Sequence, residues 1–150
     1  MTSSAVEGLI IRSAVAADAA RIAELSGLLG YPIPQEAAVS RVEHVLARSG
    51  HVLLVAERPS AGLVGWIHAA EQERLEAGRR CEILGLIVAA GQREQGIGRR
   101  LVARVECWAS EHGFEELSVR SNIIRTESHP FYQRLGYTRA KTQHVYRKKI

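Results

Sequence analysis

The stretch EILGLIVAAGQREQGIGRRL, residues 82–101, decides the fold of this chain. Its first half is an apolar run typical of a buried strand, and its last residues begin an amphipathic helix. Between them lies a basic loop with Gly96 and Gly98, which lack Cβ atoms and let backbone amides approach an anion. The first turn of the helix adds unpaired N–H groups and the positive end of the helix dipole. The stretch therefore predicts a binding site for a phosphate-bearing ligand.

The spacing within the loop argues against two common phosphate-binding motifs. Gly91 and Gly96 have the spacing of a P-loop, but Ile97 and Gly98 stand where that motif needs Lys and Ser or Thr. A dinucleotide fingerprint needs glycine in place of Leu101 and a position in the first βα turn of the fold. We therefore expect neither a nucleoside triphosphatase nor a dinucleotide-binding dehydrogenase.

Three blocks of sequence resemble one known family. The RxxGxG string at 93–98, which follows a strand, resembles the acyl-CoA pyrophosphate loop of the GNAT N-acetyltransferase superfamily. The block at 121–137, SNIIRTESHPFYQRLGY, resembles the SNxxRxxxHxFYxxxGY element that closes the coenzyme site of that family. The LGYP turn at 29–32 resembles a turn between the first two helices of a subset of small members. The blocks stand in the order of the family and cover nearly the whole chain.

The apolar pattern predicts an α/β chain. Strands are expected at 8–14, 51–57, 62–71, 81–89, 116–122 and 144–148, and helices from about 15, around 39–46, at 97–112 and around 131–135. The resemblance implies a GNAT fold, with a mixed, mostly antiparallel sheet of six to seven strands and about four flanking helices. It also implies a parallel pair of strands that splays apart at the coenzyme site.

Composition predicts one ordinary globular domain. The chain has 150 residues, of which 46% are hydrophobic and 24% charged, so we expect a single domain over 1–150 with a flexible start at 1–6. No apolar run approaches the roughly 20 residues of a membrane span, and the first residues lack signal-peptide features, so a cytoplasmic location is expected. Cys81 and Cys107 form no disulfide framework, and the six histidines lack paired metal-ligand spacing, so we expect no metal.

The net charge of +4 does not predict a nucleic-acid partner. Only 5% of the residues are aromatic, and the basic residues gather at the glycine loop and at 147–149 rather than along one face. A polyanionic coenzyme accounts for the first cluster, and a solvated terminus accounts for the second.

The resemblance assigns residues to an acetyl-CoA site. A bulge near Gly85 would splay the central strand and expose its backbone to the pantetheine arm; packing alone is the other interpretation of this glycine. The backbone contacts of the strand are implied for Leu86, Ile87 and Val88. The pyrophosphate contacts are implied for Arg93, Glu94, Gln95, Gly96, Ile97, Gly98 and Arg99. Asn122 resembles an asparagine that contacts pantetheine, and a turn residue is the equal alternative.

Two side chains are candidates for proton transfer. Glu82 matches a strand glutamate that acts as general base, and period-two alternation places it on the face of Leu86 and Val88 unless a bulge shifts the register. A half-exposed strand residue paired with Arg79 or Arg80 is the alternative. Tyr132 matches the general acid that protonates the departing thiolate, and a core aromatic beside Phe131 is its alternative. The amide of Val88 is a candidate donor to the developing oxyanion.

The acceptor is less well defined by the sequence. The resemblance implies an acceptor site near the first two helices and a strand pair, which makes Tyr31, Trp66 and His68 candidates by their placement, although the two aromatic residues serve equally well as packing residues. The resemblance implies direct attack of an amine on acetyl-CoA in a ternary complex, and we expect a primary amine of a small molecule. A non-catalytic acyl-CoA-binding regulator and an acetyltransferase acting on protein or aminoacyl-tRNA amines remain open. No membrane partner is expected, and a homodimer is implied by the resemblance.

Overall fold

The computed structural model describes residues 8–93, 95–121, 123 and 127–150, which form two compact units, Met1–Arg120 and Ser121–Ile150. The first unit contains, in chain order, β1 (Ile10–Ser13), η1 (Ala16–Asp18), α2 (Ala19–Leu28), α3 (Gln35–Ala47), β2 (His51–Arg58), β3 (Gly62–Arg74), β4 (Gly78–Val88), η2 (Ala90–Gln92), α4 (Ile97–Glu111) and β5 (Leu117–Val119). The second unit contains α5 (Ser128–Arg134).

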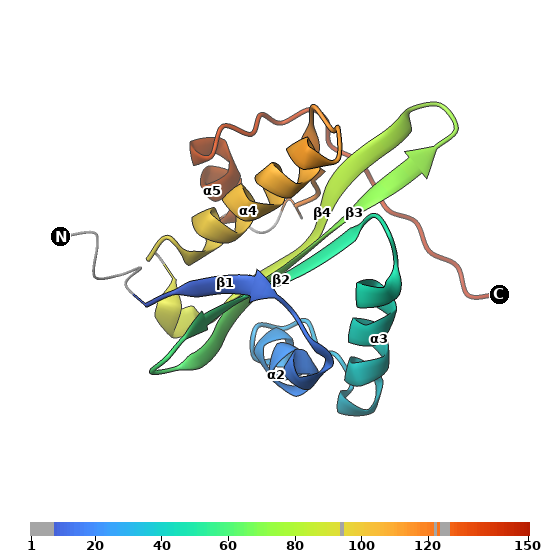
Figure 1. Cartoon of the computed structure of the whole chain (residues 1–150). Helices are drawn as coiled ribbons and strands as arrows, with labels where there is room; N and C mark the ends of the chain where they lie inside the picture. Colours follow the sequence, from blue (N-terminus) through green and yellow to red (C-terminus); the bar gives the residue numbers. More distant parts are fainter. Residues whose placement is uncertain (1–7, 94, 122, 124–126) are drawn as a thin grey trace. The chain divides into compact units, whose positions relative to one another are not determined.

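One sheet organises the first unit. Its strands lie in the order β1-β2-β3-β4-β5, with antiparallel pairing from β1 to β4 and a parallel pair formed by β4 and β5. Helices α2 and α3 lie on one side of the sheet and α4 on the other (Figure 1). The expected mixed, mostly antiparallel sheet with a parallel pair is confirmed, and the described residues form five strands rather than six or seven.

The expected final strand at 144–148 is wrong for this structure, since residues 138–150 have no regular secondary structure. Val145 is 70% exposed and Tyr146 is 89% exposed, so the apolar residues of this segment bury little surface. A strand needs a neighbour for its backbone hydrogen bonds, and residue pattern alone does not supply one.

The hairpin between β3 and β4 is longer than the sequence predicts. The polar residues at 72–80 were expected to form a connection, but Gln72, Glu73 and Arg74 pair with Arg80, Arg79 and Gly78. A long two-stranded ladder can carry polar side chains on both faces when it extends into solvent, so its residues lack the apolar alternation that marks a buried strand.

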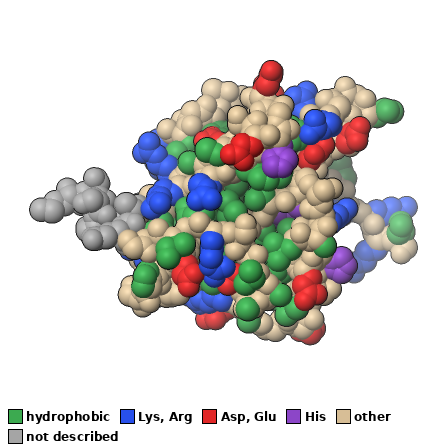
Figure 2. Space-filling view, viewed as in Figure 1, with side chains coloured by type: hydrophobic (Ala, Val, Ile, Leu, Met, Phe, Trp, Pro, Cys, Tyr) green, Lys and Arg blue, Asp and Glu red, His purple; other side chains and the backbone are tan. Residues whose placement is uncertain are grey.

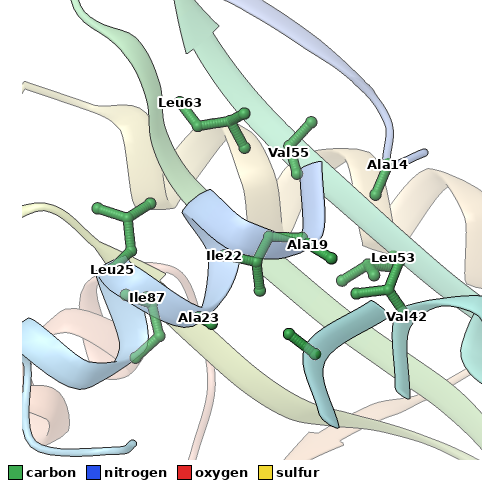
Figure 3. Packing of buried hydrophobic residues seen from close by; sticks show 11 residues of the cluster. Ala14, Ala19, Ile22, Ala23, Leu25, Val42, Leu53, Val55, Leu63 and Ile87 are labelled. Carbon is green, nitrogen blue, oxygen red and sulfur yellow. The ribbon is translucent and has the colours of Figure 1, made fainter. Parts of the chain in front are cut away.

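The core on the α2 and α3 side is built from small and branched apolar residues. Ile22 and Leu25 of α2 and Val42 of α3 pack with residues of the sheet, among them Leu53, Val55, Leu63 and Ile87 (Figure 3). Ile22 and Leu25, which lie at helical spacing, are buried, whereas the apolar Val39 is 47% exposed. Val42 of α3 is buried as its apolar spacing indicates, and Ala38, one residue before Val39, is the second buried position.

On the opposite side, α4 buries Ile97, Leu101 and Val105. Trp108, one turn after Val105, is only half-buried, and Ala109 takes the buried position beside it. The helix ends at Glu111, and Gly113 follows with a φ of +83°, which confirms the predicted stop. Among the described helices, none is both long and apolar enough to cross a membrane.

Candidate active site

A β-bulge interrupts β4 next to Gly85. His68 of β3 lies opposite Gly85, and the next β3 residue, Ala69, lies opposite Ile83, so Leu84 is the extra residue. Leu84 is 43% exposed, as expected for a residue without a cross-strand partner. The predicted bulge is therefore confirmed, and it falls where the pairing of β4 changes.

Beyond the bulge, one edge of β4 has no strand beside it in the described part of the chain. The parallel pairing with β5 covers only Cys81, Glu82 and Ile83. On the other edge, pairing with β3 continues to Val88, and the Ala89 amide donates to Val64 O at 2.8 Å. After Ile83, β4 therefore stays paired with β3 along one edge and, in the described residues, is unpaired along the other.

The alternation of an antiparallel ladder fixes which backbone groups face that open edge. Since Ala89 bonds to β3, its second neighbour Ile87 also directs its N–H and C=O toward β3. Leu86 and Val88 then direct theirs away from β3, toward the side that β5 has left. The side chain of Ile87 is buried as well, so neither its backbone nor its side chain faces the open edge. Leu86 and Val88, by contrast, direct their backbone groups toward that edge.

The glycine loop lies directly after this strand. Gly96 caps α4 with a φ of +80° and a ψ of +6°, a left-handed conformation that side chains disfavour. Ile97 is 1% exposed, so only its backbone can reach a ligand. The side chain of Gln95 accepts a hydrogen bond of 2.8 Å from Arg58 Nη2, which ties the loop to the end of β2.

Positive charge surrounds the start of α4. Arg93, Arg99 and Arg100 are all exposed there. Figure 2 shows Lys and Arg side chains gathered over the start of α4 and over β1. Because the first-turn amides of a helix lack intrahelical acceptors, this end of α4 combines N–H donors with fixed positive charge. Glu94 lies outside the described residues.

Glu82 lies on a different face from the one that simple alternation predicts. It pairs with Ala70, which shares a face with His68, and His68 pairs with Gly85. The bulge therefore moves Glu82 to the face of Gly85 and Ile87, opposite to Leu86 and Val88.

The alternative interpretation of Glu82, a half-exposed strand residue paired with Arg79 or Arg80, is wrong. Glu82 is 7% exposed, rather than half-exposed, and its Oε1 accepts a hydrogen bond of 2.9 Å from Arg120 Nε. Arg79 instead pairs with Glu71, and Arg80 with Glu116. Sequence reasoning missed Arg120, because the pair with Glu82 depends on the parallel register between β4 and β5.

Trp66 joins α2 to the bulge. Its Nε1 donates to the Oγ of Ser26 at 3.2 Å, and Ser26 is buried in α2. A Cβ built on Gly85 would lie 2.8 Å from the Cη2 and Cζ3 atoms of the Trp66 ring. Both interpretations of Gly85, a bulge and a packing role, are therefore confirmed: it adjoins the bulge, and its missing side chain leaves room for the indole of Trp66. Trp66 is a packing residue; contact with an acceptor stays a prediction.

His68 has a partner that sequence reasoning missed. Its Nε2 lies 3.1 Å from Nδ1 of His51, the first residue of β2. Burial, with a smaller contribution from His51, lowers the pKa of His68 to about 4. Burial also lowers the pKa of His51, with Arg48 adding to the effect. Both rings are therefore neutral at pH 7. Only the antiparallel register of β2 and β3 brings these two residues together.

Comparison with known proteins identifies the family. A sequence profile described as the acetyltransferase (GNAT) family matches residues 21–137. The chain belongs to the GNAT acetyltransferase family. It is 26% identical over 117 residues to aminoglycoside N(6')-acetyltransferase type 1 of Serratia marcescens, an alignment that covers 74% of this chain and 79% of that protein.

Solved structures agree in fold. The aminoglycoside 6'-N-acetyltransferase AAC(6')-Ih of Acinetobacter baumannii superposes with a TM-score of 0.83 at 19% identity, covering 95% of this chain and 99% of that one. The structure of AAC(6')-Iy with the bisubstrate analogue CoA-S-monomethyl-acetylneamine superposes with a TM-score of 0.84 at 20% identity, covering 95% and 99%. The GNAT fold expected from the sequence is therefore confirmed.

The second GNAT block lies in the second unit. Tyr132 belongs to α5 and is half-buried, with its ring 5.0 Å from Phe131 and 5.8 Å from Tyr137 between centroids. Phe131 is half-buried as well. Pro130 is accommodated in the first turn of α5. Asn122 lies outside the described residues, and the role of Tyr132 stays a prediction.

Tyr31 follows α2 and is 47% exposed. Its amide donates to the carbonyl of Ser26 at 2.8 Å, which closes the end of the helix. Its contact with an acceptor stays a prediction. Within the described residues, no group of three or more His, Cys, Asp or Glu side chains is arranged to hold a metal ion.

Proposed function

We propose that this protein transfers the acetyl group of acetyl-CoA to a primary amine of a small molecule. The observation that carries the proposal is the open edge of β4: the backbone groups of Leu86 and Val88 face away from β3, next to a loop and helix end suited to phosphates. The membership of the chain in an acetyltransferase family supports the same activity. The aminoglycoside acceptor of the Serratia relative makes aminoglycosides the first amines to test.

The residues present fit a coenzyme with a pantetheine arm and a pyrophosphate. Leu86 and Val88 would hydrogen-bond the amides of the arm as a neighbouring strand does. The amides of Ile97, Gly98 and Arg99 would hold the pyrophosphate, with Arg93 and Gln95 beside them. Acetyl-CoA, when bound, supplies the acetyl group as a thioester that an amine can attack.

The protein must then move protons and stabilise charge. An alkyl amine with a pKa of about 10.4 is mostly protonated at neutral pH, so a base has to remove its proton before attack. Glu82 is the proposed base, and Arg120 holds its carboxylate in place. The amide of Val88, on the open edge, donates to the oxygen on which negative charge develops. Tyr132 is the proposed acid for the leaving sulfur.

The proposal is tested by two measurements on one preparation. Calorimetry should show binding of acetyl-CoA, and thiol release should follow when aminoglycosides, amino acids or polyamines are added. Turnover with one class establishes the activity and the acceptor together. Binding without turnover on any amine would favour a regulator, and absence of binding would refute the assignment of the β4 edge and the loop.

A homodimer remains a prediction from the family resemblance. Sedimentation velocity over a range of protein concentrations would test it.

A further inference from the structure

Arg120 and Glu82 are joined by a single hydrogen bond. The Nε of Arg120 donates to Oε1 of Glu82 at 2.9 Å, and no second bond joins the two side chains in the described contacts. A bidentate pair of arginine and carboxylate would use two nitrogens and both oxygens. Oε2 of Glu82 and both Nη atoms of Arg120 are therefore without a partner within the part of the chain that the structure describes.

The two side chains differ in their access to solvent. The side chain of Arg120 is 58% exposed, whereas that of Glu82 is 9% exposed. A molecule that arrives from solvent meets the guanidinium first and the carboxylate behind it. The pair thus presents outer N–H donors with a fixed positive charge and an inner oxygen that accepts.

The pair lies where one edge of β4 becomes free. Arg120 directly follows Val119, the last residue of β5. Val119 pairs with Ile83, and beyond Ile83 this edge of β4 has no neighbouring strand in the described residues. Glu82 precedes Ile83 on the same strand. A molecule held by both side chains would therefore lie beside the edge that is proposed to bind the pantetheine arm.

Two other arginines at this end of the sheet are paired with carboxylates of the surface. Arg79 pairs with Glu71, and Arg80 pairs with Glu116. Arg120 differs from both because its carboxylate partner is buried and is also the proposed base. A cation next to the base is well placed to bind a second group of the molecule whose amine the base deprotonates.

We propose that the Nη atoms of Arg120 bind a carboxylate of the acceptor while Oε2 of Glu82 takes the proton of its amine, so that the acceptor is a free α-amino acid. The inference rests on the proposed function and deepens it by naming the class of amine. The planar guanidinium suits a carboxylate because two of its N–H groups can donate in parallel.

The contact between the two side chains limits the spacing of the acceptor's groups. The free oxygen of Glu82 and each free nitrogen of Arg120 lie two covalent bonds from the atoms that share the 2.9 Å hydrogen bond. An amine at the first and a carboxylate at the second must therefore lie close together. They do so when one carbon carries both, and each added methylene group moves them apart.

This requirement separates the candidate acceptors. The amino-terminal residue of a protein carries a peptide bond in place of a free carboxylate, and an aminoacyl-tRNA carries an ester. Neither offers an anion at the carbon next to the amine. An aminoglycoside carries several cationic amines and no carboxylate, so the guanidinium of Arg120 would repel it.

Each step leaves atoms and charges balanced. Oε2 of Glu82 gains a proton as one N–H bond of the ammonium breaks. The free amine forms a C–N bond to the acetyl carbon, the C–S bond breaks, and Tyr132 gives its proton to the sulfur. The nitrogen loses its second proton to water as the amide forms, and exchange with water returns both side chains to their starting states. The net products are an N-acetyl amino acid, CoA with a free thiol and one proton.

The test compares amines in matched pairs. Each member of a panel of the protein amino acids is paired with the amine that lacks only its carboxylate, for example leucine with isopentylamine and lysine with cadaverine. Thiol release gives kcat/KM for both members with the unaltered protein, Arg120→Gln and Arg120→Lys. Glycine, β-alanine and γ-aminobutyrate then test the spacing. Arg80→Gln is the matched control, since Arg80 is also an exposed arginine paired with a glutamate.

The unaltered protein should use at least one amino acid with a kcat/KM about tenfold or more above that of its partner amine, because the carboxylate adds charged hydrogen bonds. Activity should fall along the series from glycine to γ-aminobutyrate. Arg120→Gln should bring the ratio within each pair close to one, mainly through KM for the amino acid, with the Kd for acetyl-CoA nearly unchanged. Arg80→Gln should keep the full ratio.

The ratio separates substrate binding from mere support of Glu82. If Arg120 only positioned the base, Arg120→Gln would lower kcat equally for both members of each pair and leave the ratio unchanged, which would overturn the inference. Circular dichroism checks that Arg120→Gln is folded. Arg120→Lys keeps a positive charge beside Glu82 but loses the planar pair of donors, so it should lower the ratio severalfold and serves as the second variant.

Two results with the unaltered protein are decisive before any variant is made. Turnover that is equal within every pair, or confined to amines without a carboxylate, would refute the amino acid acceptor and leave the proposed acetyltransferase in place. Absence of turnover on every amine would remove the proposed function and this inference with it.

Discussion

The indole ring of Trp66 occupies the space that a side chain on Gly85 would need. A Cβ on Gly85 would stand 2.8 Å from two ring carbons of Trp66, while the Nε1 of the same ring donates to the buried hydroxyl of Ser26. One residue without a side chain therefore lets β3, β4 and α2 meet at the bulge. This contact positions the strand whose open edge carries the proposed function.

Substituting Gly85 by Ala should destabilise the protein by about 1–3 kcal/mol, the usual cost of inserting a methyl group into a packed site. The new methyl group must push the indole aside, which breaks its bond to Ser26. Urea unfolding followed by circular dichroism measures the change in the free energy of unfolding.

Gly27→Ala is the matched control, since no atom lies within 4 Å of a Cβ there and the residue is inside α2. Alanine at this helical position should leave stability unchanged or raise it by about 1 kcal/mol. Equal stability of Gly85→Ala and the unaltered protein would contradict the packing role of Gly85.

Gly96→Val should weaken acetyl-CoA binding at least tenfold in calorimetry. Its φ of +80° is strained for a β-branched residue, by about 1–2 kcal/mol, and the added side chain blocks approach to the amides at the start of α4. Circular dichroism should show the fold retained. Gly91→Val is the control, because Gly91 has open space around its Cβ position. Normal binding by Gly96→Val would refute the phosphate site at this helix end.

Glu82→Gln should lower turnover by about 100-fold or more while acetyl-CoA binding is retained, because the amide cannot accept the proton of the amine. Raising the pH should restore part of the rate, since more of the amine is then unprotonated. Thiol release as a function of pH gives both quantities. Glu71→Gln, which removes a carboxylate paired with Arg79 in the hairpin, should keep its turnover. A pH profile of Glu82→Gln parallel to that of the unaltered protein would exclude Glu82 as the base.

The sequence predicted most helices and strands of the fold, but it did not predict which residues pair between neighbouring strands. Apolar spacing predicted α2, α3 and β2, and it predicted β4 followed by α4. Each of these elements buries a regular stripe of its own residues. Glu82 and Arg120, or His51 and His68, meet only through strand register, and one extra residue at Leu84 decides which face Glu82 takes. Local pattern carries no information on such a one-residue shift until the neighbouring strand is placed. The prediction of a strand at 144–148 was wrong for the same reason. A strand needs a neighbouring strand for its backbone hydrogen bonds, and the residues of the segment do not show whether one is present.

Tyr132→Phe should reduce kcat by about 100-fold with little change in KM, if the phenol protonates the departing sulfur. The ring is kept, so its contacts with Phe131 and Tyr137 and the stability of α5 should persist. Steady-state thiol release measures the effect, and Tyr146→Phe, at an 89% exposed position in the final segment, is the control. Undiminished kcat in Tyr132→Phe would assign the tyrosine to packing alone.

The depressed pKa of His68 predicts acid sensitivity of the fold. In the unfolded chain this histidine binds a proton near its ordinary pKa of 6.5, but in the folded protein only near 4. Between these values the unfolded state binds more protons, so stability falls as the pH is lowered from 6.5 toward 4. The ion-paired carboxyl groups of Asp18 and Glu71, whose pKa values are lowered by Arg12 and Arg79, stay ionised through the upper part of this window.

The measurement is Tm by calorimetry at pH 7 and pH 5 for the unaltered protein and for His68→Gln. The unaltered protein should lose more Tm over this interval than the variant, which has no proton to gain at this position. His44→Gln, altered at an exposed histidine, should lose as much as the unaltered protein. An equal loss in His68→Gln would mean that His68 titrates normally in the folded state, and the neutral imidazole pair would then be incorrect.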